Sequence, residues 1–403
     1  MSEKIDVLIS GLGPAGALTA QRLAHLLKEE NDSFSVLAIE RKEVIGKPVF
    51  CGEFMPTVDE MQNLMPEAVD FEVFRIDEKY FYTKTRKIVF VDPKGSEKET
   101  HFQGYSFDRA RWLQDLVDDA KLNGIEVWTS AQLESYNFQE NIAKICHNGE
   151  LKLIEPKILI CAEGYHSVIN KAVNLTLHRQ KSDYVATTGF QIVTDLQENP
   201  EEVYMYFGKR YSPGAYAWII PKGNYTANIG TGLRSTHKTD ETAAQIMKNL
   251  FTHPHAKNFL NGAKPTNKMG KPVPVGLPPK KLVRRNVVGI GDAVNQVISA
   301  VGAGIPPAQL ASDLLTKSLV NVLIGRNSLE MYEKAAERHL NPAIRRSWKF
   351  RRIFDKISTS DSRFTKYFSL LSSNDIRAAT IARLNLKLKL LSPFIPLGNL
   401  LFT

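Results

Sequence analysis

Three glycines near the start of the chain are spaced to bring the backbone close to a phosphate group. Gly11, Gly13 and Gly16 follow an apolar, β-branched run and open a helix-periodic segment. Glycine at these positions permits a tight turn and close approach to a pyrophosphate, and the helix N-terminus offers free N–H groups to an anion. The pattern predicts a dinucleotide-binding unit, with Ala15 at the helix start as a further cofactor contact.

The elements that position these glycines follow from the hydrophobic periodicity. Residues 5–10 are predicted to form a buried parallel strand, and residues 15–28 a helix. A second strand is expected over residues 34–39. It ends at Glu40, whose carboxylate stands where such folds bind a ribose hydroxyl, and Arg41 beside it is another expected cofactor contact.

A second glycine-rich segment discriminates between FAD and NAD. A strand-like run ends at Gly291 and Asp292, and an Asp at this point can accept hydrogen bonds from a ribityl chain, which FAD has and NAD lacks. A helix is expected from the following loop to about residue 325, and its N-terminus would stabilise an anionic reduced flavin ring. The cofactor contacts expected here are Gly291, Asp292, Gly302, Ala303, Gly304 and Ile305.

The region between these motifs has a different pattern. Residues 185–232 alternate as in an antiparallel sheet, with strands expected at 187–194, 203–207, 216–220 and 225–231. Tyrosine, phenylalanine and tryptophan are concentrated there. Such a sheet can form the wall of an apolar tunnel over the flavin ring.

Together these segments resemble the FAD-binding superfamily of the p-hydroxybenzoate hydroxylase type over residues 1–330. That superfamily has a middle motif of the form Asp-Gly-x-x-Ser. Glu163 and Gly164 stand at this place, with Glu instead of Asp and with residues 170–171 (Asn-Lys) where an Arg is usual. An Arg at a helix start reaches the FAD in that superfamily, and Arg109 matches it. The resemblance implies FAD contacts for these three residues.

Two further segments resemble one branch, the geranylgeranyl reductases, notably the archaeal ones that saturate membrane lipids. Residues 43–53 are similar to the stretch after the second strand of those enzymes. Residues 216–222 resemble their Tyr-x-Trp-x-Phe-Pro-Lys motif, with Ile220 in place of Phe. The resemblance implies a hydride transfer from reduced FAD to C=C double bonds of an isoprenoid lipid, on archaeal-type membrane lipid precursors.

The motif residues receive roles from this resemblance. Three side chains are catalytic candidates, namely Cys51, Tyr216 and Trp218. Cys51 either supplies a proton or a redox-active thiol near the flavin, or only shapes its loop; Tyr216 and a held water are the other candidate proton donors. Cys51 and Gly52 are also expected FAD contacts. The expected substrate contacts are Tyr216, Trp218, Pro221 and Lys222, although Lys222 also suits a phosphate or FAD contact.

The three cysteines, Cys51, Cys146 and Cys161, fit neither zinc spacing nor a Cys-x-x-Cys pattern, so no metal site is expected. The predicted fold is α/β, with a Rossmann-like FAD-binding domain, an antiparallel β-sheet substrate domain and a helical C-terminal segment. The FAD-binding domain is assigned to residues 1–80, 101–183 and 284–330, the β-sheet domain to residues 81–100 and 184–283, and the basic helical region to residues 331–403.

The formal net charge of +9 is concentrated at the end of the chain. From Arg338 onward there are thirteen Lys or Arg and three Asp, interleaved with apolar residues, including a leucine-rich helix expected over residues 378–391. This pattern suits an anionic membrane surface, and its alternative is a solvated basic face. With neither a signal peptide nor an apolar run near the ~20 residues that span a bilayer, we expect a cytoplasmic protein, peripheral on the inner face of the membrane. No nucleic-acid partner is expected.

Other functions share the scaffold. Flavin hydroxylases and halogenases share it, and the halogenases have a Trp-x-Trp-x-Ile-Pro segment close to residues 216–221. Related prenyl carriers keep the fold without flavin chemistry, and chlorophyll-pathway reductases use NADPH on a prenylated pigment. The segment around Cys51 differs from that of the halogenases, and the intact Gly291 and Asp292 favour a bound flavin. The external electron donor (ferredoxin, NAD(P)H or another) stays open.

Overall fold

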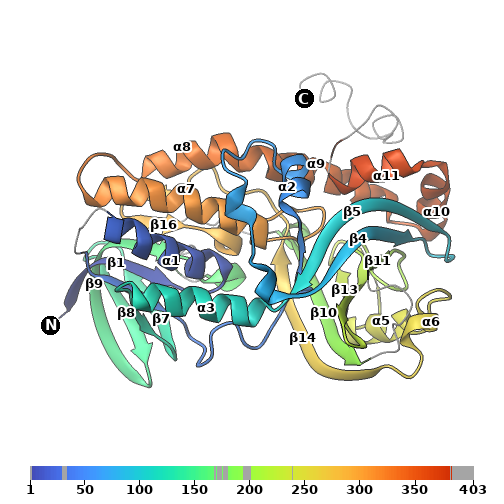
Figure 1. The fold of residues 1–403 in the computed structure, drawn as a ribbon, viewed down its shortest axis with the longest axis horizontal. Helices are drawn as coiled ribbons and strands as arrows, with labels where there is room; N and C mark the ends of the chain where they lie inside the picture. Colours follow the sequence, from blue (N-terminus) through green and yellow to red (C-terminus); the bar gives the residue numbers. More distant parts are fainter. Residues whose placement is uncertain are drawn as a thin grey trace.

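The computed structural model describes residues 2–29, 34–167, 180–193, 201–237 and 239–381, with the single residues 169, 175 and 383. Two sheets of eight strands each lie side by side, and helices cover them along one long edge of the molecule (Figure 1). The mixed α/β fold with a helical C-terminal region is the predicted one.

The first sheet is mainly parallel and holds the dinucleotide motifs. Its order is β15-β16-β9-β1-β2-β6, with β7 and β8 as an antiparallel hairpin beside β9. The strands are β1 (Glu3–Ser10), β2 (Val36–Ile39), β6 (Glu126–Trp128), β7 (Ala131–Asn137), β8 (Ile142–His147), β9 (Glu150–Cys161), β15 (Val283–Arg284) and β16 (Val287–Gly289). The apolar run predicted as a buried parallel strand is β1, and its last four residues are buried on both faces.

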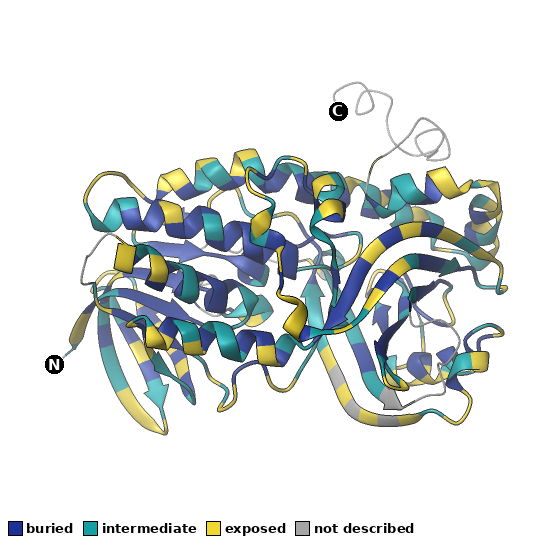
Figure 2. Ribbon diagram, in the orientation of Figure 1, coloured by how far each residue is buried: buried dark blue, intermediate teal, exposed yellow. Residues whose placement is uncertain are grey.

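Register brings the two glycine motifs together. Ser10 pairs with Cys161, and Cys161 pairs with Gly289, so β1, β9 and β16 end at one edge of the sheet. The loops that follow these strands therefore lie side by side although they are far apart in sequence. Helices α1 (Pro14–Glu29), α3 (Arg109–Leu122) and α7 (Ile305–Leu323) pack on this sheet, and their inner faces are buried with the strands (Figure 2).

The second sheet has the order β14-β10-β13-β12-β11-β4-β5-β3. Its strands are β3 (Phe54–Pro56), β4 (Phe81–Val91), β5 (Glu97–Phe107), β10 (Tyr184–Val193), β11 (Glu202–Tyr206), β12 (Ala217–Gly223), β13 (Thr226–Leu233) and β14 (Lys264–Pro274). The four predicted strands are β10 to β13, with residue 194 outside the described part. One pairing is not antiparallel: β11 runs parallel to β4, because a long excursion through the first sheet separates the two strands.

The domain boundary expected between residues 100 and 101 falls inside a strand, since β5 continues in the second sheet to Phe107. The short strand β3 also joins this sheet. The division into two domains stays a prediction. Helices α5 (Ala243–Leu250) and α6 (Lys257–Leu260) cover one face of the second sheet.

The opposite face of the second sheet carries the C-terminal helices. These are α9 (Asn341–Ile357), α10 (Asp361–Leu370) and α11 (Ser373–Thr380), and α2 (Val58–Leu64) lies beside them. Phe364, Phe368 and Ile376 pack there with strand residues such as Ile88 and Met205. The helix α8 (Glu330–His339), which precedes α9, packs on α7 instead. Most of the leucine-rich segment at residues 378–391 lies outside the described residues. Within the described residues, no helix has the length and apolar character needed to cross a bilayer.

Candidate active site

One cavity connects the two sheets. Its volume is about 1000 Å³, and it is lined by the loops at the carboxyl edge of the first sheet, by one face of the second sheet and by the C-terminal helices. Gly11 and Gly13 line the first part, Cys51 and Tyr216 the part between the sheets, and Phe364 the part under the helices. The cavity therefore joins the predicted cofactor site to the predicted substrate sheet.

In the first glycine motif, backbone atoms pack directly against one another. Gly11 has φ +95°, and a Cβ there would lie 2.6 Å from the carbonyl oxygen of Ala162. A Cβ on Gly16 would lie 1.8 Å from the carbonyl oxygen of Gly11, so helix and strand meet without side chains. Gly13, in contrast, borders open space, with no atom within 4 Å of its Cβ position. This opening at the N-terminus of α1 fits a pyrophosphate.

Glu40 supports the same turn from the end of β2. One carboxylate oxygen accepts the N–H of Leu12 at 2.9 Å, and the other accepts the N–H of Lys42 at 3.1 Å. Glu40, Arg41 and Lys42 all line the cavity. Burial lowers the pKa of the Lys42 ammonium, while nearby Glu40 opposes that shift. Basic groups are thus held where a cofactor phosphate would fit.

The end of β9 contributes the middle motif. Glu163 accepts hydrogen bonds from the hydroxyls of Ser10 at 3.1 Å and Ser167 at 2.6 Å. Burial raises the pKa of Glu163, against the effect of these hydrogen bonds. Gly164, with φ +75°, borders open space on the cavity wall, and Arg109 of α3 also lines the cavity. Residues 170–171 lie outside the described part.

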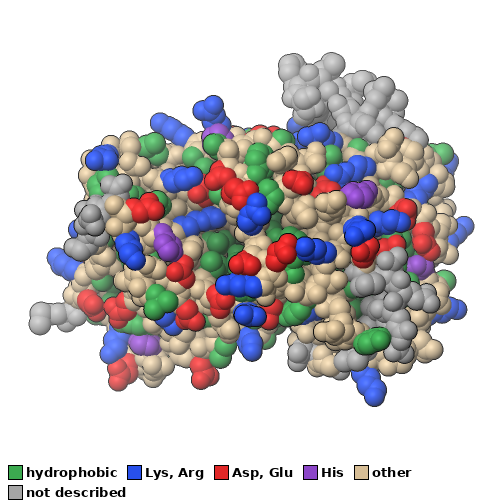
Figure 3. Space-filling model, viewed as in Figure 1, with side chains coloured by type: hydrophobic (Ala, Val, Ile, Leu, Met, Phe, Trp, Pro, Cys, Tyr) green, Lys and Arg blue, Asp and Glu red, His purple; other side chains and the backbone are tan. Residues whose placement is uncertain are grey.

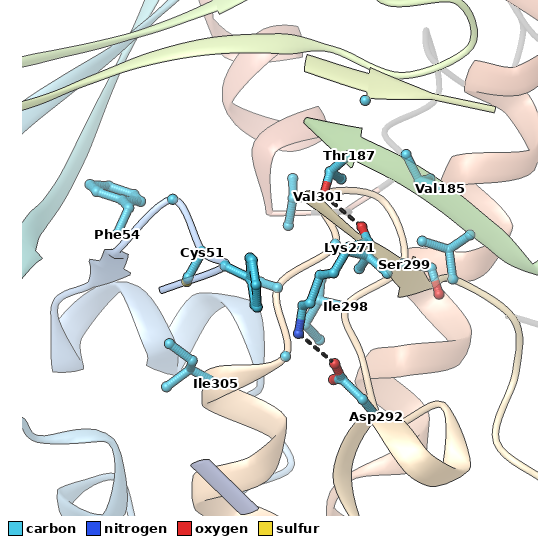
Figure 4. A pocket seen from close by; sticks show the side chains of 18 of the residues that line it. Cys51, Phe54, Val185, Thr187, Lys271, Asp292, Ile298, Ser299, Val301 and Ile305 are labelled. Carbon is cyan, nitrogen blue, oxygen red and sulfur yellow. Dashed lines mark hydrogen bonds and ion pairs between the residues drawn. The ribbon is translucent and has the colours of Figure 1, made fainter. Parts of the chain in front are cut away.

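The return loop packs onto the first motif. A Cβ on Gly304 would lie 2.7 Å from a carboxylate oxygen of Asp292, and one on Gly291 would lie 2.8 Å from the Cβ of Ala15. The Asp292 carboxylate is 3.3 Å from the ammonium of Lys271, which reaches it from β14 (Figure 4). The cavity wall here comprises Gly291, Asp292, Gly302, Ala303, Gly304 and Ile305.

The two motifs shared with the geranylgeranyl reductases meet on the second sheet. The indole N–H of Trp218 donates to the side-chain oxygen of Asn228 at 2.8 Å, and the Asn228 amide donates to the carbonyl oxygen of Cys51 at 2.9 Å. A Cβ on Gly52 would lie 3.0 Å from Cδ1 of Ile220. The Cys51 loop is therefore fastened to β12 through one buried amide.

Tyr216 precedes β12 and lies in the cavity wall. Its hydroxyl donates to the carbonyl oxygen of Val301 at 2.6 Å, which ties the substrate sheet to the loop before α7. Burial raises the pKa of Tyr216, and the nearby Cys51 adds to the shift, so the phenol stays protonated at neutral pH. The Tyr216 and Trp218 rings are arranged edge to face at 6.1 Å.

Pro221 and Lys222 are placed differently from the expected substrate contacts. Neither is among the cavity-lining residues of the described chain. Side chains alternate along β12, so Trp218 and Ile220 face the cavity while Pro221 faces away. The Lys222 ammonium is buried in an ion pair with Glu53 at 2.6 Å. Burial raises the pKa of Glu53, and Lys222 opposes that shift.

Comparison with known proteins supports the fold. The model of the family described as "Geranylgeranyl reductase catalytic domain" matches residues 184–264. In this segment the chain is therefore similar to the geranylgeranyl reductases. The matched segment spans β10 to β13 and the start of β14, which are the strands that hold Tyr216, Trp218 and Asn228.

Similarity to known proteins extends beyond this segment to most of the chain. The digeranylgeranylglycerophospholipid reductase of Methanocaldococcus jannaschii is 25% identical over 368 residues, 90% of this chain and 89% of that one. Digeranylgeranylglycerophospholipid reductase 1 of Methanococcoides burtonii is 24% identical over 347 residues, 83% and 80% of the two chains.

Solved structures share the fold. A geranylgeranyl bacteriochlorophyll reductase-like protein of Thermoplasma acidophilum has a TM-score of 0.79 and 21% identity, and covers 98% of this chain and 100% of its own. The myxobacterial chondrochloren halogenase CndH, an FAD-dependent halogenase, has a TM-score of 0.67 and 15% identity, with 95% and 87% coverage. This chain thus shares its overall fold with both proteins.

Several residues of the candidate site are not predicted by the sequence analysis. Asn228 is fully buried in an otherwise small and apolar strand, and a lone amide in such a strand is the signal that points to it. Lys42 and Lys271 line the cavity from segments whose sequences resemble ordinary charged loops and edges, and Glu53 lines it from the last position of the family-like segment 43–53. Arg234 also lines the cavity, and it follows β13 directly.

Proposed function

We propose that this protein is a flavin-dependent reductase that saturates C=C double bonds of geranylgeranyl chains on archaeal-type membrane lipid precursors. One observation carries the proposal. The Cys51 loop and β12, joined through Asn228, form the wall of a cavity that continues from the dinucleotide loops to an apolar chamber under the C-terminal helices. A cofactor and a hydrocarbon chain can therefore meet at one place.

FAD is the cofactor that we assign to the first part of the cavity. The open space at Gly13 and Gly164 suits its pyrophosphate and ribose, with Glu40, Glu163 and Arg109 around them. Asp292 and the N-terminus of α7 suit the ribityl chain and flavin ring. When bound and reduced, FAD supplies the hydride for alkene reduction.

The chamber beyond Trp218 suits an isoprenoid chain. Phe54, Phe102, Phe207 and Ile220 on the sheet side face Phe364 and its neighbours on the helices. These apolar side chains bind a hydrocarbon by the hydrophobic effect and exclude water from the reacting bond. The aromatic wall also orients the chain across the cavity.

The protein must also hold a proton near the reacting bond, because an isolated alkene is a poor hydride acceptor. Cys51 and Tyr216 are the proton-holding groups that we assign, and a held water is the third candidate. The Tyr216 phenol is protonated at neutral pH, as tyrosine ordinarily is, and burial raises its pKa further. Trp218 acts as a positioning residue. Its indole N–H donates to the side-chain oxygen of Asn228, and the Asn228 amide donates to the carbonyl oxygen of Cys51.

Anaerobic reduction tests this function. The FAD-loaded protein is reduced with dithionite in the presence of a geranylgeranylated lipid, and the lipid is examined by mass spectrometry. A gain of one pair of hydrogens per double bond is expected. Turnover that requires oxygen, with no gain in hydrogen, would instead indicate a hydroxylase or halogenase, whose fold this chain shares.

We further propose that the reductase is cytoplasmic, receives electrons from an external donor such as ferredoxin or NAD(P)H, and works at an anionic membrane surface. Lys349, Arg352 and Lys356 are exposed at helical spacing on α9, and basic side chains project from the edge where α8 and α11 lie (Figure 3). Other basic residues are used internally, as in the ion pair of Arg346 with Glu67. Liposome flotation that depends on anionic lipid is the expected result.

A further inference from the structure

Two arginines meet in the cavity wall, outside the site assembled above. Arg234 follows β13, and Arg351 lies on α9. Both donate to the carbonyl oxygen of Ser182, at 2.8 Å and 2.9 Å. Their exposed fractions are 2% and 6%, and both line the cavity. Two guanidinium groups are thus packed against each other on one neutral acceptor.

The charge of this pair is only partly balanced. Arg234 is 2.8 Å from a carboxylate oxygen of Asp355, whereas Arg351 has no ion pair with any residue that the structure describes. Asp355 also attracts Arg351, and Asp183 attracts both arginines, but neither carboxylate forms an ion pair with Arg351 in the described chain, and that of Asp183 accepts the N–H of Gln180. Burial lowers the pKa of Arg351 to about 10, and Arg234 adds to the shift, so both remain charged at neutral pH.

Unused donors line the same cavity, and Ser299 lies by this wall because the N–H of its neighbour Ala300 donates at 2.9 Å to the hydroxyl of Ser347, one turn before Arg351 on α9. The Nε atoms of both arginines and the hydroxyl of Ser299 are buried without a hydrogen-bond partner in the described part of the chain. Ser299 lines the cavity too, beside Val185 and away from Cys51 (Figure 4). Buried cations and donors are costly unless a partner satisfies them, and an anion entering the cavity is a partner for all three residues.

We propose that Arg351, Arg234 and Ser299 form a subsite for the phosphate group of the isoprenoid substrate. The planar forks of arginine match phosphate oxygens in pairs. The position also suits a charged head with an apolar tail, because Phe350 and Phe354 on the same helix α9 line the cavity next to Arg351. Ser299 is two residues from Val301, whose carbonyl accepts the Tyr216 hydroxyl, so the head would lie near the proposed reacting position.

This subsite deepens the proposed function and rests on it. A phosphate could come from two kinds of substrate, a glycerophosphate lipid or a prenyl diphosphate, and both present the same chemistry to the arginines. The two sources are separated by using matched ligand pairs: digeranylgeranylglycerol phosphate against digeranylgeranylglycerol, and geranylgeranyl diphosphate against geranylgeraniol.

Binding of each pair to the FAD-loaded protein, without reductant, tests the subsite. Arg351→Met should weaken binding of the phosphorylated ligand about tenfold or more while changing binding of the alcohol less than about twofold, as expected for loss of a charge-assisted hydrogen bond. Arg351→Lys should restore part of the loss. Arg326→Met is the control, since Arg326 is an exposed arginine that does not line the cavity, and it should change neither.

A second readout does not need lipid. Inorganic pyrophosphate should raise the Tm of the FAD-loaded wild type and of Arg326→Met, but not that of Arg351→Met. Equal weakening of phosphorylated and unphosphorylated ligands, or no preference for phosphate in the wild type, would overturn the subsite. A phosphate preference that depends on Arg351, without any saturation of the lipid on reduction, would keep the subsite and overturn the reductase function.

Discussion

The cofactor part and the substrate part of the cavity are constructed differently. Around Gly11, Gly13 and Gly16, backbone atoms form the cavity wall. The segments approach closely there because the glycines have no Cβ atoms. Around Tyr216 and Trp218 the wall is side chain, and it is held by hydrogen bonds between segments distant in sequence. The first part therefore depends on local chain geometry, whereas the second depends on tertiary packing.

The largest loss of stability is expected where a new side chain disrupts the backbone packing of the first glycine motif. In Gly16→Ala the new Cβ collides with the carbonyl of Gly11, and we expect a loss of stability above about 4 kcal/mol and no bound flavin. Thermal unfolding and flavin absorbance measure both. Gly13→Ala is the control, because its Cβ enters open space: the fold should survive and only flavin affinity should fall. An equal loss of stability in Gly16→Ala and Gly13→Ala would contradict the inference that Gly16 packs against backbone while Gly13 borders open space.

The next effect concerns the ion pair beneath the Cys51 loop. Lys222→Met leaves the Glu53 carboxylate buried without its cation, which should cost about 3–5 kcal/mol of unfolding free energy. Adding Glu53→Gln removes the stranded charge and should recover much of the loss. Denaturant unfolding of both variants provides the measurement. A double variant less stable than Lys222→Met alone would show that the pair has another role.

A smaller effect is expected at the substrate wall. Trp218→Phe removes the indole N–H that holds Asn228 and should lower stability by about 1–2 kcal/mol. Asn228 also donates a hydrogen bond to the carbonyl of Cys51, so the rate of lipid saturation should fall further in Trp218→Phe than in Trp128→Phe. Trp128→Phe is the control because it loses an indole hydrogen bond to Glu126 outside the cavity. Similar rates for the two variants would separate Trp218 from the positioning of Cys51.

The smallest expected effect is a pH dependence at the cofactor part. Burial raises the pKa of Glu163 in the folded protein above its ordinary value of 4.5, so the folded state keeps this proton to higher pH than the unfolded state does. Stability from this group is therefore fully present below about pH 4.5 and is lost as pH rises through the raised pKa. Glu163→Gln should flatten the curve of unfolding free energy against pH over this window, as measured by denaturant unfolding at a series of pH values. A curve that keeps its slope in Glu163→Gln would assign the pH dependence to another group.

Sequence patterns were sufficient for the cofactor part because its determinants are local. The glycines, the strand before them and the helix after them lie within one short segment, so periodicity and turn chemistry place them. The pairing of β11 with β4, the bridge made by Asn228 and the meeting of Arg234 with Arg351 all join distant segments. No local pattern encodes such contacts.

Lys222 illustrates the same limit inside a recognisable motif. Its sequence position suggests a cation available to a phosphate, and only the packing of the Cys51 loop against β12 shows that Glu53 is its partner. The phosphate-binding role passes, in our proposal, to Arg351, which lies on a helix that the motif does not include. Motif residues thus locate the cavity wall better than they define each side chain's role.

The most direct test of the central claim follows the flavin itself. The FAD-loaded protein is reduced without excess reductant, kept free of oxygen and mixed with a geranylgeranylated lipid while flavin absorbance is recorded. The account predicts that the lipid reoxidises the flavin, with one double bond saturated for each flavin reoxidised. A flavin that binds the lipid but stays reduced until oxygen is admitted would contradict it.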